Sequence, residues 1–244
     1  MKLLLHACCG PCSLEPVRLL HAAGHELALA YMNSNIHPQS EYTHRLDTLL
    51  AWAHAESIPV IEGVYSPRSW EAQAGCFGAA ASTREDRCRA CYRLRLEEVA
   101  RYAAEHDFDG IGSTLSVSPY QYTTIIEEEL ARAAERSGLV SVFEDFRPFY
   151  EEATRKSHEL GMYRQNYCGC HYSAAEAARQ REERALERRV RKQEERAAHA
   201  DEIAVAEKLR AAKKAERQRF AEKQAAKRAI KDRLRHEASQ NREA

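Results

Sequence analysis

Short apolar runs alternate with longer stretches of helical periodicity over the first two thirds of the chain. Short apolar runs are typical of buried strands, and apolar positions repeating every three or four residues indicate amphipathic helices. We expect strands at 2–7, 27–32, 59–65, 110–117 and 140–143. We expect helices at 13–23, 41–57, 91–106, 123–136 and 151–160. Strands that alternate with helices in this way predict an α/β fold, a Rossmann-like (HUP-like) parallel sheet flanked by helices.

The pattern changes at about residue 173. From there the chain consists mostly of Ala, Glu, Arg, Lys and Gln, without Gly or Pro, and these residues are strong helix formers. Apolar residues are too sparse for a sustained coiled-coil seam. We therefore expect two parts, an α/β domain at 1–172 and a charged, helical or partly disordered tail at 173–244. The tail is either a solvated helix or a surface that contacts RNA, and the sequence leaves both open.

Charge divides the chain at the same place. The whole chain is balanced, with 37 basic and 37 acidic residues, but residues 173–244 hold 21 basic and 14 acidic residues, a net charge of +7. The body has the opposite net charge of −7, which excludes an obvious nucleic-acid surface by bulk charge. We find no signal peptide and no run of about 18 apolar residues that could cross a membrane. A cytoplasmic, reducing location is therefore expected, with no membrane partner.

The cysteines give the clearest chemical signal. All eight lie within residues 1–172, and seven form three clusters: Cys8-Cys9-x-x-Cys12, Cys88-x-x-Cys91 and Cys168-x-Cys170. Thiolate ligands select zinc, Cu(I) or iron–sulfur clusters, and clustered cysteines in a reducing compartment are more often ligands or redox thiols than a disulfide framework. The isolated Cys76 is expected to be a buried apolar residue. We expect part of 70–87 to form a loop over this site.

Adjacent cysteines are awkward for one tetrahedral zinc and fit a polynuclear cluster better. The first Cys pair together with Cys88 and Cys91 supplies four thiolates, the number that a [4Fe–4S] cluster needs. The expected helix start near Cys91 favours thiolates through the helix dipole. Three thiols are then surplus. Cys168 and Cys170 either close a reducible disulfide or bind a second metal together with Cys12.

Polar and aromatic residues follow several expected strands and form a candidate substrate pocket. Asn35 follows the second strand, and Tyr120 and Gln121 follow the fourth, where aromatic rings either stack on a base or pack. Asp145 and Arg147 form either a local ion pair or a site acid beside a phosphate-binding cation. Tyr163 and Gln165 precede the last cysteines and are expected to shape the cavity.

Taken together, these motifs resemble the QueH type of epoxyqueuosine reductase. The resemblance covers about residues 1–173 and rests on five segments in order. They are His6–Ser13, Arg87–Leu94, Ser118–Gln121, Asp145–Arg147 and Tyr163–Cys170. It implies the last step of queuosine synthesis, reduction of the epoxide of epoxyqueuosine at the tRNA wobble position, without cobalamin.

Specific roles follow from the resemblance. Cys8, Cys9, Cys88 and Cys91 match the ligands of a [4Fe–4S] cluster, and Cys168 and Cys170 match a redox-active pair. The family also holds an additional mononuclear iron, for which Cys12 is the candidate ligand here. Asp145 or a tyrosine is expected to deliver a proton, and an external donor to supply electrons, since no flavin or nicotinamide fingerprint is present.

The chain departs from the family pattern in two places, and two other functions compete with the reductase. Tyr122 stands where the family often has an acidic residue, and the tail lies outside the shared core. A PP-loop nucleotide-dependent tRNA-modifying enzyme fits the α/β order, but its phosphate loop is replaced by the first cysteine cluster, whose Pro11 lacks a backbone donor. A zinc-stabilised RNA-binding module predicts a colourless protein without redox activity.

Overall fold

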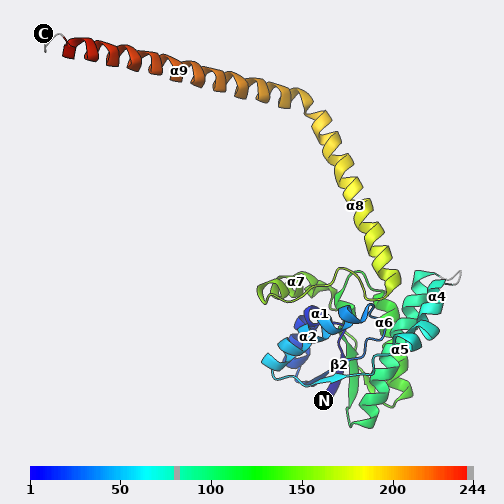
Figure 1. The fold of residues 1–244 in the computed structure, drawn as a ribbon. Helices are drawn as coiled ribbons and strands as arrows, with labels where there is room; N and C mark the ends of the chain where they lie inside the picture. The colour runs from blue at the N-terminus through cyan, green and yellow to red at the C-terminus, as the bar shows by residue number, and fades with distance from the viewer. Residues whose placement is uncertain (80–82, 241–244) are drawn as a thin grey trace. The chain divides into compact units, whose positions relative to one another are not determined.

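A parallel sheet forms the centre of the first of two units into which the chain divides after Arg179. The computed structural model describes residues 1–79 and 83–240 (Figure 1). Within them the sheet has five strands in the order β3-β2-β1-β4-β5. The strands are β1 (Lys2–His6), β2 (Glu26–Tyr31), β3 (Val60–Glu62), β4 (Gly110–Ser113) and β5 (Val140–Ser141). Every neighbouring pair is parallel, which confirms the predicted α/β class. The finer HUP-like assignment stays a prediction.

Strand β1 lies in the middle of the sheet and is buried on both faces. Leu3 and Leu5 point into one hydrophobic cluster, and Leu4 points into the other. This is why its apolar residues run continuously instead of alternating with polar ones. The strand order reverses between β1 and β4, and in open parallel sheets ligands bind in the crevice at the carboxyl ends of the strands at such a reversal.

Helices cover both faces of the sheet (Figure 1). The helices α1 (Gly10–Ala22), α2 (Gln39–Ala55) and α7 (Tyr150–Glu159) pack on the face that carries Leu3 and Leu5. The opposite face is covered by α5 (Arg84–Glu105) and α6 (Thr123–Arg136). The layered arrangement therefore holds the loops after the strands at one edge, where the predicted site residues lie.

Four helices begin earlier than we predicted, and in two of them, α1 and α5, the change takes in cysteines. Helix α1 begins at Gly10, because Pro11 suits a first turn where its missing N–H needs no partner, so Cys12 lies in the helix rather than in a loop. Helix α5 begins at Arg84, where Thr83 and Asp86 form a reciprocal capping box. Cys88 therefore lies beyond the first turn of α5. The expectation that the start of this helix stabilises the thiolates of Cys88 and Cys91 through its dipole is wrong.

The stretch that we expected to form a loop is largely helical. It contains α3 (Pro67–Trp70), the π-helical segment η1 (Glu71–Gly75) and α4 (Cys76–Ala79), while residues 80–82 lie outside the described part of the chain. Trp70 and Ala74 are buried against Cys91 and Cys170, which gives these short helices their packing. The described residues 70–79 therefore pack against the cysteines as short helices, and the rest of the expected loop falls partly on residues 80–82.

The last strands are shorter than predicted. After β4 the chain turns into the 3-10 segment η2 (Thr114–Val117), where the Ser113 hydroxyl accepts from the backbone N–H of Leu115 at 3.2 Å. A further 3-10 segment, η3 (Arg147–Phe149), precedes α7. Side-chain capping thus ends β4 at Ser113 although the apolar pattern continues beyond it.

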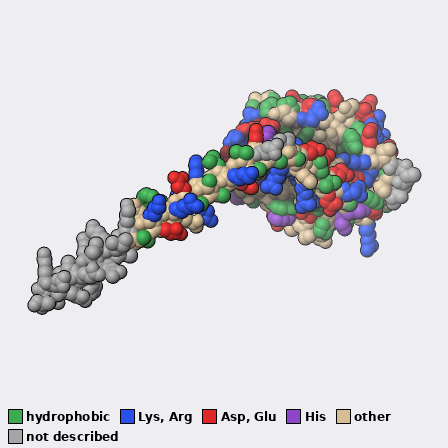
Figure 2. Space-filling model, turned by 90° about the horizontal axis from the view of Figure 1, so that it is seen from above, with side chains coloured by type: hydrophobic (Ala, Val, Ile, Leu, Met, Phe, Trp, Pro, Cys, Tyr) green, Lys and Arg blue, Asp and Glu red, His purple; other side chains and the backbone are tan. Residues whose placement is uncertain are grey.

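The tail is helical, as the composition predicted. Helix α8 (His171–Ala198) begins in the first unit, and α9 (Ala200–Gln240) follows it. Between 180 and 226 the described side chains are exposed except for the half-buried Ala185. Figure 2 shows basic, acidic and hydrophobic side chains mixed along the described part of the tail. The predicted domain boundary at residue 172 stays a prediction, and no helix in the described residues is long and apolar enough to span a membrane.

Candidate metal centre

The first cysteine cluster is already gathered into a compact group of sulfurs. Cys8 and Cys9 follow β1 directly, and Cys12 lies in the first turn of α1. Their three Sγ atoms lie within 4.8 Å of one another, and the Sγ atoms of Cys8 and Cys9 are 3.8 Å apart. Cys8 is also held by Thr114, whose Oγ1 donates to its Sγ at 3.6 Å. Three soft ligands at this spacing are suited to bind a metal ion.

The second and third clusters meet beside Trp70. Cys91 and Cys170 belong to one buried cluster with Trp70, although they come from α5 and from the turn before α8. Cys168 is close enough to Cys88 and Cys91 for a charge on it to raise the pKa of both. The fold therefore brings together cysteines that are about 80 residues apart in the sequence.

All eight cysteines are free thiols, including Cys168 and Cys170. Cys76 is exposed and stands apart from the three clusters, so the expectation that it is a buried apolar residue is wrong. It lies at the start of the short helix α4, where its side chain reaches solvent. This exposed thiol provides a natural internal control for the buried ones.

Burial shapes the acidity of these thiols. It raises the pKa of Cys88 to about 12 and that of Cys91 to about 11. In the first cluster, hydrogen bonds from Cys12 and Cys8 hold the pKa of Cys9 well below its ordinary value, whereas contacts with Cys8 and Cys9 raise that of Cys12. Neutral buried thiols beside one favoured thiolate lose their remaining protons when a metal ion binds.

Two predicted pocket residues contact the cysteines. Gln165 donates from Nε2 to the Sγ of Cys9 at 3.0 Å. Gln121 accepts a hydrogen bond of 2.6 Å from the Tyr92 hydroxyl, and its Oε1 lies 3.8 Å from the Sγ of Cys168. The Gln165 amide therefore lies beside the first cysteine cluster and the Gln121 amide beside the third.

Other predicted residues lie around this group. Asn35 is buried beside the turn that contains Gly169. The Tyr163 hydroxyl donates to Glu41 at 2.7 Å, while Tyr120 is 55% exposed. Asn35 and Tyr163 thus have fixed positions, whereas the Tyr120 ring meets the Tyr150 ring edge-on at 6.4 Å between centroids and stays more than half exposed.

Asp145 and Arg147 form the local ion pair that the sequence offered as one alternative. The Arg147 guanidinium donates to the Asp145 carboxylate at 2.5 Å, and both side chains are partly exposed. This hydrogen bond lowers the pKa of Asp145, so its acid form is scarce at neutral pH.

Sequence reasoning missed one arginine beside the cysteines. Arg95 lies one helical turn after Cys91 on α5, is only 2% exposed, and has its Nη1 4.0 Å from the Cys91 Sγ. The available signal was its position on the apolar face of α5, four residues after a cysteine and next to Leu96. A charged residue on such a face calls for a partner in the core.

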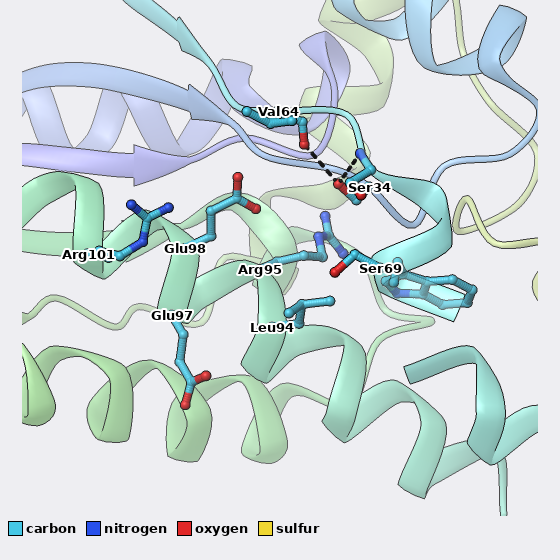
Figure 3. Close-up of a pocket in the computed structure, with 10 residues that line it drawn as sticks. Ser34, Val64, Ser69, Leu94, Arg95, Glu97, Glu98 and Arg101 are labelled. Atoms are coloured by element: carbon cyan, nitrogen blue, oxygen red, sulfur yellow. Dashed lines mark hydrogen bonds between the residues drawn. The ribbon is translucent and has the colours of Figure 1, made fainter. Parts of the chain in front are cut away.

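Arg95 also lines a cavity of about 410 Å³ (Figure 3). Residues of α3, α5 and the turns after β2 and β3 line it, among them Ser34, Trp70, Glu98 and Arg101. Burial raises the pKa of the Glu98 carboxyl. Trp70 and Arg95 thus form a wall between this cavity and the cysteines.

Comparison with known proteins matches nearly all of the first unit to one family. A family model described as "Epoxyqueuosine reductase QueH" matches residues 3–176. The epoxyqueuosine reductase QueH of Haemophilus influenzae is 34% identical over 186 residues, 75% of this chain and 75% of the relative. That of Thermotoga maritima is 33% identical over 178 residues, 71% of this chain and 90% of the relative. That of Dehalococcoides mccartyi is 31% identical over 176 residues, 72% of this chain and 93% of the relative. The chain therefore belongs to the epoxyqueuosine reductase QueH family.

Proposed function

We propose that this protein reduces epoxyqueuosine to queuosine at the wobble position of tRNA, the last step of queuosine biosynthesis. The observation that carries the proposal is the gathering of three cysteine clusters at one edge of the sheet in a chain of this family. The proposed location is the cytoplasm, where thiols stay reduced and tRNA is at hand.

The thiols fit an iron–sulfur centre. We assign Cys8, Cys9, Cys88 and Cys91 as ligands of a [4Fe–4S] cluster, and Cys12 as a ligand of an additional iron. The fit rests on the donor set, since these sulfurs are soft and the three of the first cluster lie within 4.8 Å of one another. When bound, such a centre supplies single electrons and a Lewis acid for the epoxide oxygen.

The electron balance gives Cys168 and Cys170 a role. Conversion of an epoxide to an alkene and water takes two electrons and two protons. Oxidation of two thiols to a disulfide releases the same number, and an external donor then restores the thiols. Alternatively, the two sulfurs bind the additional iron.

Side chains around the sulfurs are proposed to bind the substrate. Gln121 and Gln165 present amides beside Cys168 and Cys9, and Asn35 lies against the turn of Gly169. Beyond them, we assign contacts with the modified nucleotide to Tyr120, Arg147 and Tyr163. Asp145 is the predicted acid, but because its carboxylate is ion-paired, a tyrosine is the better proton donor in this proposal.

Anaerobic purification with iron, sulfide and zinc analysis tests the proposal, together with electron paramagnetic resonance spectra and an assay on tRNA that carries epoxyqueuosine. We expect a brown protein with about four or five irons per chain that bleaches on reduction. Cys91→Ser should lose most of its iron and its activity, because a buried ligand is removed. Cys76→Ser is the matched control and should keep both, because this thiol is exposed and belongs to none of the three cysteine clusters. A colourless wild-type protein with one tightly bound zinc would contradict the proposal.

A further inference from the structure

Arg95 is a buried cation that lacks the carboxylate partner that other buried arginines have. Arg45 is 1% exposed and pairs with Glu41 at 2.7 Å, and Arg87 pairs with Glu176 at 2.6 Å. Arg95 is 2% exposed, and no carboxylate oxygen among the described side chains lies within 4.0 Å of its guanidinium. An unpaired charge costs several kcal/mol in a protein interior. The chain therefore needs another anion at this place.

The guanidinium is held in one position by neutral groups. Its Nη2 donates to the Asn33 Oδ1 at 2.5 Å, and the Asn33 amide is in turn fixed by a hydrogen bond of 2.8 Å to the carbonyl of Ala7. The Nη1 lies 4.0 Å from the Cys91 Sγ, and the buried Nε has no hydrogen-bond partner. This arrangement orients the charge toward the cysteines without neutralising it.

Thiols of the cysteine clusters act on Arg95 electrostatically, and so does the Glu98 carboxyl. Burial opposes the charge of Arg95, while thiolate charges on Cys91, Cys168 and Cys8 favour it, so that the net effect raises its pKa. Glu98 lines the cavity on the other side of Arg95 (Figure 3), but its carboxylate lies beyond ion-pair distance. The Cys91 Sγ lies 4.0 Å from the Arg95 Nη1, closer than any carboxylate oxygen of the described side chains, so we place the missing anion on the cysteine side.

We infer that Arg95 is a positioning residue that supplies the counter-charge for the cysteine-ligated iron centre and raises its reduction potential. The inference rests on the proposed function. A cluster with four thiolate ligands has a net negative charge, and its reduction adds another. A fixed cation stabilises the reduced form more than the oxidised form. Loss of the charge therefore makes the centre harder to reduce.

The test compares reduction potentials of the iron-loaded full-length chain. Arg95→Met removes the charge at similar volume, and Arg95→Lys keeps it. Arg93→Met is the matched control, since Arg93 lies on the same helix but pairs with Glu129, away from the cysteines. We expect Arg95→Met to weaken one-electron reduction at least tenfold, which is about 59 mV. Arg95→Lys should recover most of this loss, and Arg93→Met should leave the potential unchanged.

Unfolding temperatures separate this role from ordinary packing. If Arg95 serves the iron centre, the metal-free Arg95→Met chain should be at least as stable as the metal-free wild type, and iron should stabilise it less. A destabilised metal-free variant, or an iron-loaded variant with an unmoved potential, would overturn the inference and leave the proposed function intact. Wild-type protein without an iron–sulfur spectrum would overturn both.

Discussion

Gly169 separates Cys168 from Cys170 and occupies a position that other residues do not fit. Its φ of +150° lies in a region that side chains rarely adopt, and an added Cβ would lie 2.7 Å from the Asn35 Nδ2. Its carbonyl accepts from the backbone N–H of His37 at 2.9 Å. The turn is therefore packed closely against the chain after β2, and this contact sets where the two sulfurs lie.

Gly169→Ala should displace both thiols and reduce activity at least tenfold, with a strain of about 1–3 kcal/mol. The matched control is Gly138→Ala, because Gly138 also has a positive φ of +67° but would meet nothing within 4 Å. The control should lose stability without losing activity. Thermal unfolding and turnover of epoxyqueuosine-containing tRNA measure the two effects, and equal turnover by both variants would show that the turn does not position the thiols.

At the level of elements, α5 and α6 are joined through one buried carboxylate. Glu129 on α6 is 1% exposed and pairs with Arg93 at 2.9 Å and Arg89 at 3.0 Å on α5, and with Arg132 at 2.8 Å on its own helix. Although burial opposes ionisation, these arginines hold the pKa of Glu129 below its ordinary value. The pair of helices that carries Cys88 and Cys91 is thus stabilised by a charge network.

Glu129→Gln should lower the free energy of unfolding by about 2 kcal/mol at pH 7, since a hydrogen-bonded buried charge is lost. The folded-state pKa is depressed, so this stability is present above the unfolded-state value of 4.5 and disappears as the pH falls through the folded-state value. Urea unfolding at pH 7 and at about pH 3.5 measures the difference, which should shrink at the lower pH.

The control for this substitution lies on the same helix. Glu135 is exposed on α6 and forms none of the ion pairs above. Glu135→Gln should change stability by less than about 0.5 kcal/mol at either pH. A loss at Glu129 that persists unchanged in acid would point to packing rather than to charge.

The whole molecule consists of two units that differ in composition, and the family match falls within the first of them. The family match ends at residue 176, and the first compact unit ends at Arg179. All the cysteines and all the predicted pocket residues lie in this unit. The reductase chemistry should therefore be contained in residues 1–179.

A chain that ends at Arg179 should bind as much iron as the full-length chain and unfold at the same temperature. Iron analysis and calorimetry check this expectation, and a loss of either would show that the tail stabilises the core. Affinity for tRNA across salt concentrations tests the other role that the sequence left open. If the slope of log affinity against log salt concentration is unchanged in the shortened chain, the tail does not contact RNA. If the tail does contact RNA, the slope should become shallower by about 0.7–0.9 for each phosphate contact that is lost.

Much of the fold could be predicted because it depends on local pattern. The apolar run of β1 identified the central strand, and the lack of Gly and Pro after residue 173 identified the helical tail. The early start of α5 was missed although its signal is local, since Thr83 and Asp86 have the spacing of a capping box. The predicted ends of strands and helices were wrong where side-chain capping, rather than the apolar pattern, sets the end of the element.

The sequence by itself determined which chemistry the protein carries, since the cysteine motifs and their order are specific to the family. Only the tertiary structure decided which of these thiols meet and what surrounds them. The packing of Trp70 with Cys91 and Cys170, the exposure of Cys76 and the unpaired charge of Arg95 all depend on contacts between distant segments. Burial is a property of the folded chain, and burial makes the charge of Arg95 costly enough to require an anion.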